Sequence, residues 1–334
     1  MPPRDRLLAL VVALCWGVNF PATAFGLQHF PPLLMVAVRF TLLAVPTVLL
    51  VPRPRVPLRW FLGAAFFTST VQFGLLYVAM AVGMPSGLAS LVLQACAPFT
   101  VVLGALLLRE RLGTRQVVGV VVAVAGLAVI ALHRALGGSV AALVPVLLTI
   151  AAGLGWAIGN LCARQARAPK PLHFTLWLSI VPPVPLLALS LLLEGPRRDW
   201  EALRTAFTLE ALPAVLGLLY VVLVATILGY GLWNTLLSRN PAGVVAPFAM
   251  LVPVAGVLSA WLIFGEAPDA VELVAGVLVV GGVLHGSRTR RRTPAVAAEP
   301  ARPTPPGTTP PGHDNVGIPT ASEARTTRPG TGVR

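Results

Sequence analysis

The chain has 334 residues, of which 56% are hydrophobic and only 11% are charged. Because ordinary soluble domains carry about 25% charged residues, this composition and the mean hydropathy of +0.82 exclude a soluble fold. The net charge of +13 would suit nucleic acid only if the basic residues formed a binding patch. Their distribution, described below, indicates membrane topology instead, so we expect a lipid bilayer around the chain and no nucleic-acid partner.

The apolar residues form repeated stretches along the chain. A membrane-spanning helix needs about 20 apolar residues, and stretches of this length are separated by short polar breaks. We therefore expect an all-α integral membrane protein with ten transmembrane helices. They are predicted at residues 7–27, 32–51, 58–81, 87–108, 115–132, 141–163, 172–193, 211–237, 243–264 and 271–286.

The first stretch also has features of a secretory signal, because basic residues precede it and the triplet Ala22-Thr23-Ala24 resembles a cleavage site. Against this interpretation, Trp16-Gly17-Val18-Asn19 has a counterpart deep in the chain, at Trp156-Ala157-Ile158-Gly159-Asn160. A removed leader would not need such a counterpart. We expect the first helix to be retained.

Basic residues flank the spans on alternate sides. Loops on one side carry the clusters at 53–59, 109–115 and 288–292, whereas the other side has few basic residues. Because basic loops stay in the cytoplasm, both termini are predicted there. The basic residues predicted outside are Arg134, Arg197, Arg198 and Arg204.

The two halves of the apolar region resemble each other, at offsets of 155 to 157 residues in their later parts. Each half holds five predicted helices, an odd number, so the second repeat is inverted relative to the first, as in many transporters. We expect repeats at 1–136 and 137–287, followed by a disordered cytoplasmic tail at 288–334, rich in Pro, Thr and Gly. The matched residues are Pro98 with Pro253, Glu110 with Glu266, Gly119 with Gly276 and Gly126 with Gly282.

Polar side chains inside the spans are candidates for substrate binding, because the bilayer core offers them no water. Trp16 shares a helical face with Asn19, and Trp156 shares one with Asn160. An aromatic wall beside an amide suits a small amphipathic solute, but Asn could equally cap backbone near Pro21 while Trp fills space. The further candidates are Gln72, Tyr77, Gln94, Thr226, Tyr230, Trp233 and Asn234.

Two prolines interrupt the fourth and ninth spans at equivalent positions. Pro98 and Pro253 each free a backbone carbonyl, and paired interruptions point to the binding site of a transporter. We expect both helix breaks to line a central cavity. By contrast, Gly119 and Gly126 lie seven residues apart on one face and indicate close helix packing.

Arg39 lies seven residues inside the second span. An unpaired arginine at the bilayer centre costs about 2.5–3.5 kcal/mol on insertion scales. We therefore expect Arg39 either to be paired or to snorkel toward the outer surface. Its candidate partners are Glu266 in a structural ion pair, a helix carbonyl, or the carboxylate of a substrate.

Several kinds of chemistry are absent from the sequence. Lys170 is the one lysine, so a phosphate-binding loop for ATP is missing. The histidines and cysteines lack the spacing of a metal or redox site, and catalytic pairs of His and carboxylate are not evident. We expect no enzyme activity, no catalytic residues, no metal and no cofactor. The coupling ion stays open, with a proton as one choice, and so does the choice between monomer and homodimer.

Several motifs resemble those of one family. They include Trp16-Gly17-Val18-Asn19-Phe20, Val38-Arg39-Phe40, the run from Gly83 to Ala95 and Val224-Ala225-Thr226-Ile227-Leu228-Gly229-Tyr230-Gly231. Through residues 5 to 286 the chain is similar to the EamA family of the drug/metabolite transporter superfamily, and most similar to its bacterial exporters of O-acetylserine and cysteine.

This resemblance implies ten helices in two inverted repeats around a central cavity. It also implies secondary-active efflux of small amino acids or their metabolites across the bacterial inner membrane by alternating access. The tryptophans leave open an exporter or facilitator of aromatic or drug-like solutes. A membrane-embedded enzyme or a sensory scaffold is the alternative outside transport.

Overall fold

The structure is a computed structural model that describes residues 1–137 and 140–287. Within these ranges it contains ten helical spans that are long and apolar enough to cross a membrane and no strand. The predicted all-α membrane fold is therefore confirmed. The predicted tail at 288–334 lies outside the described residues.

The first half of the bundle has five spans, two of which are assembled from shorter helical pieces. The third changes from α-helix to π-helix and back, and the fourth contains a short 3-10 turn. The elements are α1 (Pro3–Leu27), α2 (Pro32–Leu50), α3 (Leu58–Ala64), η1 (Ala65–Val71), α4 (Gln72–Ala81), α5 (Ser86–Val92), η2 (Leu93–Ala95), α6 (Cys96–Leu108) and α7 (Thr114–Gly137).

The second half repeats this pattern, including a π-helix in its third span and a break in its fourth. The additional short helix α11, which lies between the predicted spans at 172–193 and 211–237, begins with proline and has an acidic first turn and a basic last turn, as suits the helix dipole. The elements are η3 (Val140–Ala142), α8 (Leu143–Ala166), α9 (Pro171–Trp177), η4 (Leu178–Ile180), α10 (Pro183–Leu193), α11 (Pro196–Thr205), α12 (Leu212–Leu219), η5 (Tyr220–Leu228), α13 (Gly229–Arg239), α14 (Ala242–Ala249), α15 (Val252–Phe264) and α16 (Ala270–Ser287).

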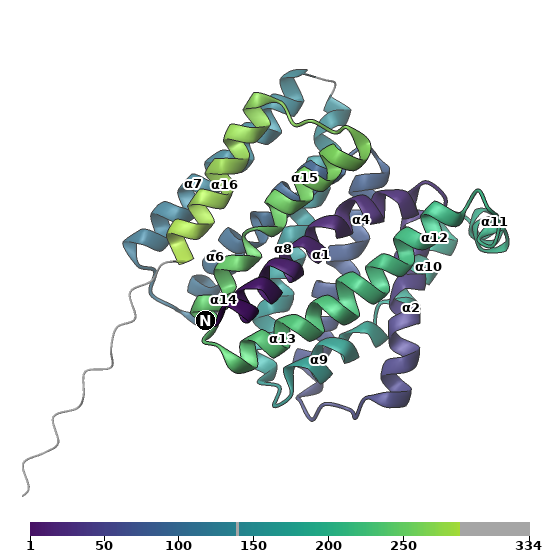
Figure 1. The fold of residues 1–334 in the computed structure, drawn as a ribbon, viewed down its shortest axis with the longest axis horizontal. Coiled ribbons are helices and arrows are strands. Elements are labelled where there is room, and N and C mark those ends of the chain that lie inside the picture. Colours follow the sequence, from purple (N-terminus) through teal and green to yellow (C-terminus); the bar gives the residue numbers. More distant parts are fainter. Residues whose placement is uncertain (138–139, 288–334) are drawn as a thin grey trace, which may run out of the picture. The chain divides into compact units, whose positions relative to one another are not determined.

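Packing in the bundle follows the inverted repeat that is typical of this kind of fold. Helix α1 packs on α15 and on the span α12–η5–α13, and its counterpart α8 packs on α6 and on the span α3–η1–α4. Three further contacts join equivalent spans: α5 with α15, and α7 with α16 and α2 with α10 (Figure 1). Both α1 and α8 therefore lie at the centre of contacts between the halves.

Glycines allow α7 and α16 to lie side by side (Figure 1). A Cβ atom at Gly119 would lie 2.5 Å from the carbonyl oxygen of Gly282, and one at Gly126 would lie 2.8 Å from that of Ala275. These distances leave no room for a side chain. The predicted role of Gly119 and Gly126 in close helix packing is confirmed.

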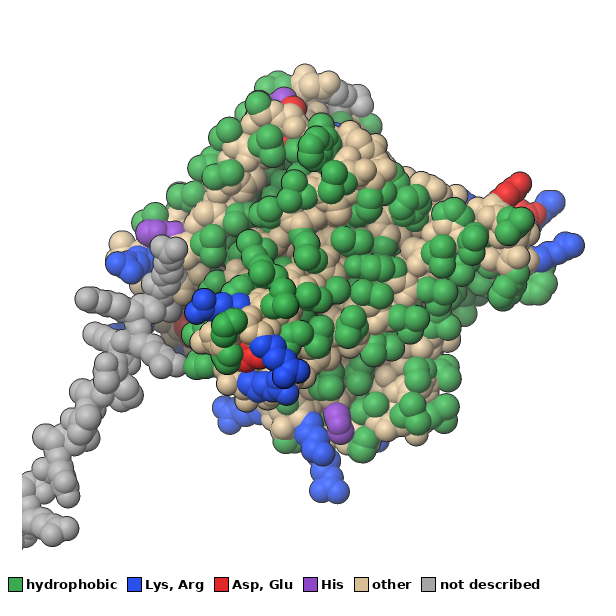
Figure 2. Space-filling view, in the orientation of Figure 1, with side chains coloured by type: hydrophobic (Ala, Val, Ile, Leu, Met, Phe, Trp, Pro, Cys, Tyr) green, Lys and Arg blue, Asp and Glu red, His purple; other side chains and the backbone are tan. Residues whose placement is uncertain are grey.

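We call the end of the bundle where α1 begins the N-face, and the other end the opposite face. In Figure 2, hydrophobic side chains cover most of the visible bundle, and Lys and Arg side chains gather toward the end where the N-terminus lies. An apolar belt with charged ends is what a lipid bilayer requires.

Candidate functional site

Arg39 is a buried cation held by neutral groups. Its residue is 3% exposed. Nη1 donates a hydrogen bond to Tyr77 Oη at 2.9 Å and Nη2 donates one to Thr226 Oγ1 at 3.2 Å. The third nitrogen of the guanidinium, Nε, has no partner among the described residues, and none of their ion pairs includes Arg39. In the described part of the chain, the positive charge is thus bound without a neutralising carboxylate.

Aromatic rings surround the guanidinium. The Arg39 Cζ atom lies 4.1 Å from the ring centre of Phe73 and 5.2 Å from that of Phe40. Such contacts stabilise a desolvated cation by about 2 kcal/mol or more, which offsets part of the cost of burial. The site therefore keeps a charged group inside the bundle.

A chain of polar groups connects Arg39 to α1. Tyr77 is 0% exposed, and its hydroxyl lies 3.4 Å from Thr23 Oγ1. Thr23 in turn donates to the backbone oxygen of Asn19 at 2.8 Å. The Asn19 side-chain oxygen is buried without a hydrogen-bond partner in the described chain. We call Asn19, Thr23, Arg39, Tyr77 and Thr226 the polar cluster.

The π-helix η5 positions Thr226 in this cluster. Thr226 Oγ1 donates to the backbone oxygen of Val221, five residues earlier, at 2.8 Å, while it accepts from Arg39. Short π segments frequently mark functional sites. The other π-helix, η1, lies at the equivalent place in the first half, and there Thr70 corresponds to Thr226 at an offset of 156 residues.

Three aromatic side chains form a second group beside η5. The rings of Tyr230 and Trp233 each lie 5.2 Å from that of Trp16, and Trp16 Nε1 donates to the Ala225 backbone oxygen at 2.9 Å. The predicted Trp16 and Tyr230 thus meet, through residues far apart in sequence. Trp16 also satisfies a carbonyl group of the π-helix.

The remaining predicted residues are distributed over several contacts. Gln94 Nε2 lies 3.6 Å from Met250 Sδ, and Asn234 donates to the Tyr230 backbone oxygen at 2.8 Å. Gln72 is buried, Asn160 is half-buried, and Trp156 packs against the main hydrophobic core. Their roles in substrate binding stay predictions.

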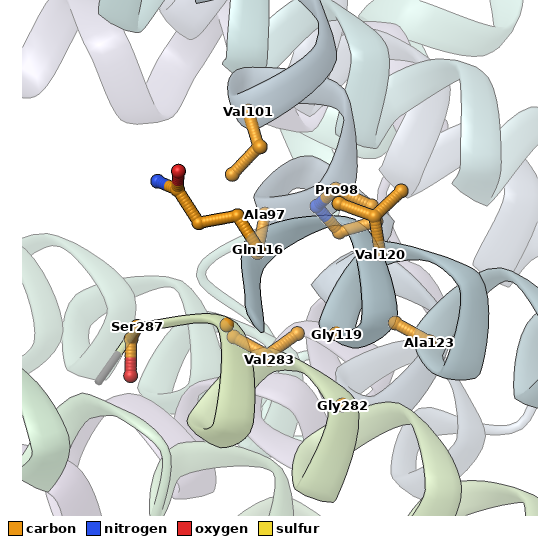
Figure 3. A pocket seen from close by; sticks show the side chains of 11 residues that line it. Ala97, Pro98, Val101, Gln116, Gly119, Val120, Ala123, Gly282, Val283 and Ser287 are labelled. Carbon is orange, nitrogen blue, oxygen red and sulfur yellow. The ribbon is translucent and has the colours of Figure 1, made fainter. Parts of the chain in front are cut away.

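The two predicted helix breaks are present, but they face different neighbours. Pro98 lines a cavity of about 270 Å³ between α6, α7 and α16, together with Gly119 and Gln116 (Figure 3). Pro253 lies at the contact between α15 and α5, where its carbonyl oxygen accepts from Ser90 Oγ at 3.3 Å. Neither Pro253 nor Arg39 is among the residues that line this cavity.

Glu266 does not form the expected ion pair with Arg39. Its Oε2 accepts from Ser86 Oγ at 2.9 Å and from the Gly87 backbone N–H at 3.2 Å. A carboxylate is favourable there because helix amino ends carry unpaired N–H groups and partial positive charge. Of the alternatives for Arg39, the structural ion pair with Glu266 is thus absent.

The comparisons with known proteins agree with this architecture. The EamA-like transporter family matches residues 6–132 and 143–285. The chain belongs to this family of transporters. The two matched ranges correspond to the two halves of the bundle, so each half of this EamA protein carries one family repeat.

Two curated relatives share the family fold over nearly their whole length. A "Probable amino-acid metabolite efflux pump" of Salmonella typhimurium is 41% identical over 298 residues, which are 87% of this chain and 98% of the relative. A protein of Escherichia coli with the same name is 38% identical over the same shares. A solved crystal structure with 20% identity and a TM-score of 0.52, covering 85% of this chain and 96% of that one, has the same fold.

Two members of the site were missed from this EamA sequence. Thr23 lies one helical turn beyond Asn19, and Phe73 one turn before Tyr77. Because residues four apart share a helix face, the spacing that selected Asn19 and Tyr77 could have found both.

Proposed function

We propose that this EamA protein exports small amino acids or their metabolites, such as O-acetylserine and cysteine, by secondary-active alternating access. The observation that carries the proposal is Arg39, which is 3% exposed and whose hydrogen-bond acceptors among the described residues are the hydroxyl groups of Tyr77 and Thr226. Arginine binds carboxylates through strong charge-assisted hydrogen bonds, and Nε is free to donate one. The two relatives named as amino-acid metabolite efflux pumps support the same cargo class.

The polar cluster suits both charged groups of an amino acid. Arg39 Nε and the side-chain oxygen of Asn19 have no hydrogen-bond partner among the described residues, so the first can donate to a carboxylate and the second can accept from an ammonium group. Thr23 and Tyr77 connect the two residues. Buried polar atoms without partners are costly, so a zwitterion that binds both would remove two such costs.

Access to the cluster requires a conformational change. Arg39 and Tyr77 are almost fully buried, so helices must separate before a solute reaches them. The inverted repeat supplies two related arrangements that open to opposite sides. We assign the N-face to the cytoplasm of the bacterial inner membrane, because the basic loops lie there.

Counterflow in proteoliposomes tests the proposal, with vesicles loaded with cysteine, O-acetylserine or other amino acids and a radiolabelled tracer outside. We expect exchange of at least one of these solutes, and loss of at least about tenfold in Arg39→Gln. Arg197→Gln is the control, because that side chain is 93% exposed. Imposed proton and sodium gradients in the same vesicles identify the coupling ion.

Two results would contradict this assignment. The first is the absence of exchange for the whole panel. The second is unchanged exchange in Arg39→Gln, or equal competition by cysteine and by its decarboxylated amine, because the carboxylate would then not be recognised.

A second cargo class is favoured by the cluster of Trp16, Tyr230 and Trp233. Aromatic or drug-like solutes could stack on these rings. If this class is the cargo, phenylalanine, tryptophan or planar dyes will compete with the tracer more strongly than serine or cysteine. Trp16→Leu will then weaken competition by aromatic solutes selectively.

A further inference from the structure

On the opposite face, Glu266 binds the amino end of α5, where the fourth span begins. Helix α15 ends at Gly265 in the left-handed conformation, with φ of 68°, and this turn directs the chain away from the helix. The Glu266 carboxylate then binds the Ser86 hydroxyl and the Gly87 N–H at the start of α5. We call this contact the opposite-face latch.

The two helices joined by the latch are tightly packed. All seven residues of α5 are buried. A Cβ atom at Gly87 would lie 3.1 Å from Ala260 Cβ, and one at Gly256 would lie 2.5 Å from Ser90 Oγ. Helices α5 and α15 therefore pack closely, and a cavity of about 140 Å³ lined by Gly87, Val257 and Glu266 lies beside this contact.

The inverted repeat places a counterpart of the latch on the N-face, but its residues make different contacts. At an offset of 156 residues, Glu266 corresponds to Glu110 and Gly87 corresponds to Gly243. Helix α6 ends at Arg109 with φ of 54°, in the same left-handed turn as α15. Glu110, however, accepts from Arg164 Nη2 at 2.6 Å, and its side chain is 47% exposed.

Burial shows the same asymmetry between the halves. Helix α14 is the repeat counterpart of α5. All residues of α5 are buried. Among the described side chains of α14, Val245 is buried, whereas Val244 is 45% exposed and Ala246 and Pro247 are exposed as well. Helix α5 is thus covered more completely than the described side chains of α14.

We propose that Glu266 and Glu110 are positioning residues that bind the amino ends of α5 and α14 in turn, so that one face is held closed at a time. In this structure Glu266 holds α5 and Glu110 binds Arg164. In the alternate state Glu110 leaves Arg164 and accepts from the Gly243 N–H, while Glu266 releases Ser86 and Gly87. This inference rests on the alternating-access carrier proposed above. An exposed ion pair such as Glu110 with Arg164 adds little stability. Breaking it therefore costs little free energy when the protein changes between the two states.

Hydrogen exchange measured by mass spectrometry on the full chain in lipid nanodiscs tests this proposal without any substrate. The readouts are two peptides, one covering 86–92 and the other covering 243–249. In the parent, the first should exchange more slowly than the second. Glu266→Gln keeps an acceptor but loses the charge, and because a neutral acceptor binds about half as strongly as a carboxylate, exchange at 86–92 should become roughly tenfold faster and exchange at 243–249 should become slower.

Two substitutions on the N-face should have opposite effects. A change at Glu110 should reverse the effect of Glu266→Gln, whereas a change at Arg164, which frees Glu110, should reproduce it. Glu110→Gln replaces the charged N-face acceptor with a weaker, neutral one and should slow exchange at 86–92 while speeding it at 243–249. Arg164→Gln releases Glu110 and should act like Glu266→Gln. Ser86→Ala, a milder change, should shift both peptides as Glu266→Gln does, but less. Glu210→Gln, an exposed acid elsewhere, should change neither peptide.

Opposite changes in the two peptides support the latch pair, because a purely structural role would loosen one region without protecting the other. Faster exchange of both peptides in Glu266→Gln, or no change in either, would overturn it. Hydrogen exchange is measured without any solute. If counterflow fails, the proposed substrate class is wrong, but the hydrogen-exchange result still tests the latch pair. If counterflow is normal and hydrogen exchange is unchanged in the variants, the latch pair is contradicted and the proposed transport function stands.

Discussion

The hydroxyl oxygen of Tyr77 lies 2.9 Å from Nη1 of Arg39 and accepts a hydrogen bond from it. This contact joins α2 to α4 and continues to α1 through Thr23. A carboxylate in the place of Tyr77 would neutralise the guanidinium and compete with an anionic solute. A neutral oxygen orients the guanidinium and leaves its charge for a ligand.

Tyr77→Phe should therefore weaken transport while the bundle still assembles. The variant leaves a buried donor of Arg39 without its partner, at a cost of about 1–3 kcal/mol. We expect the apparent KM in counterflow to rise roughly tenfold or more. Tyr220→Phe is the matched control, because Tyr220 donates to the backbone oxygen of Cys15 at 3.2 Å, outside the polar cluster. Equal effects of the two changes would show that Tyr77 acts only through general stability.

The two π-helices allow a comparison of equivalent threonines. Thr226→Val removes both the acceptor for Arg39 and the donor to Val221, so transport should fall by about tenfold or more. Thr70 Oγ1 is buried without a partner in the described chain, so Thr70→Val removes an unsatisfied hydroxyl and should leave both transport and thermal stability unchanged or slightly improved. A larger loss in Thr70→Val than in Thr226→Val would contradict the assignment of the site to the η5 side.

The sequence predicts the spans better than it predicts the contacts of the polar cluster. Apolar length alone locates all ten helices, and the repeat offset correctly pairs Glu110 with Glu266. It does not predict the π-helices, because segments such as Tyr220–Leu228 consist of ordinary apolar residues whose conformation depends on packing. Nor does it predict that Glu266 binds Ser86, since the two are separated by 180 positions and only the folded bundle brings them together.

The position of Trp16 depends on a glycine in α13. A Cβ atom at Gly229 would lie 2.7 Å from Trp16 Nε1, so Gly229→Ala should displace the indole from the Ala225 carbonyl and from the Tyr230 and Trp233 rings. Transport should fall, and the intrinsic tryptophan fluorescence should shift. In Gly231→Ala the new Cβ has no neighbour within 4 Å, and the same gain in helix propensity makes it the control. Identical spectra and rates for the two variants would contradict a role for the Trp16 position.

The loop before α16 gives a prediction for pH. Asp269 Oδ1 accepts from the Glu272 N–H at 2.8 Å, and this bond, together with the nearby His133, lowers the pKa of Asp269 below its usual 3.8. A lowered pKa in the folded state means that the ionised carboxylate contributes stability above the unfolded value. This contribution is lost as the pH falls through the folded value.

Asp269→Asn separates the charge from the helix cap. Asparagine caps a helix about as well as aspartate, so the variant keeps the acceptor and loses only the charge. Its unfolding temperature in detergent should be slightly below that of the parent at pH 7, because the side chain is 49% exposed and solvent screens it. The difference should close below about pH 3.8. Asp269→Ala also loses the cap, which costs about 0.5–2 kcal/mol, and should stay less stable than the asparagine variant at every pH. A gap between parent and asparagine variant that stays constant from pH 8 to pH 3 would mean that the carboxylate charge does not stabilise this end of α16.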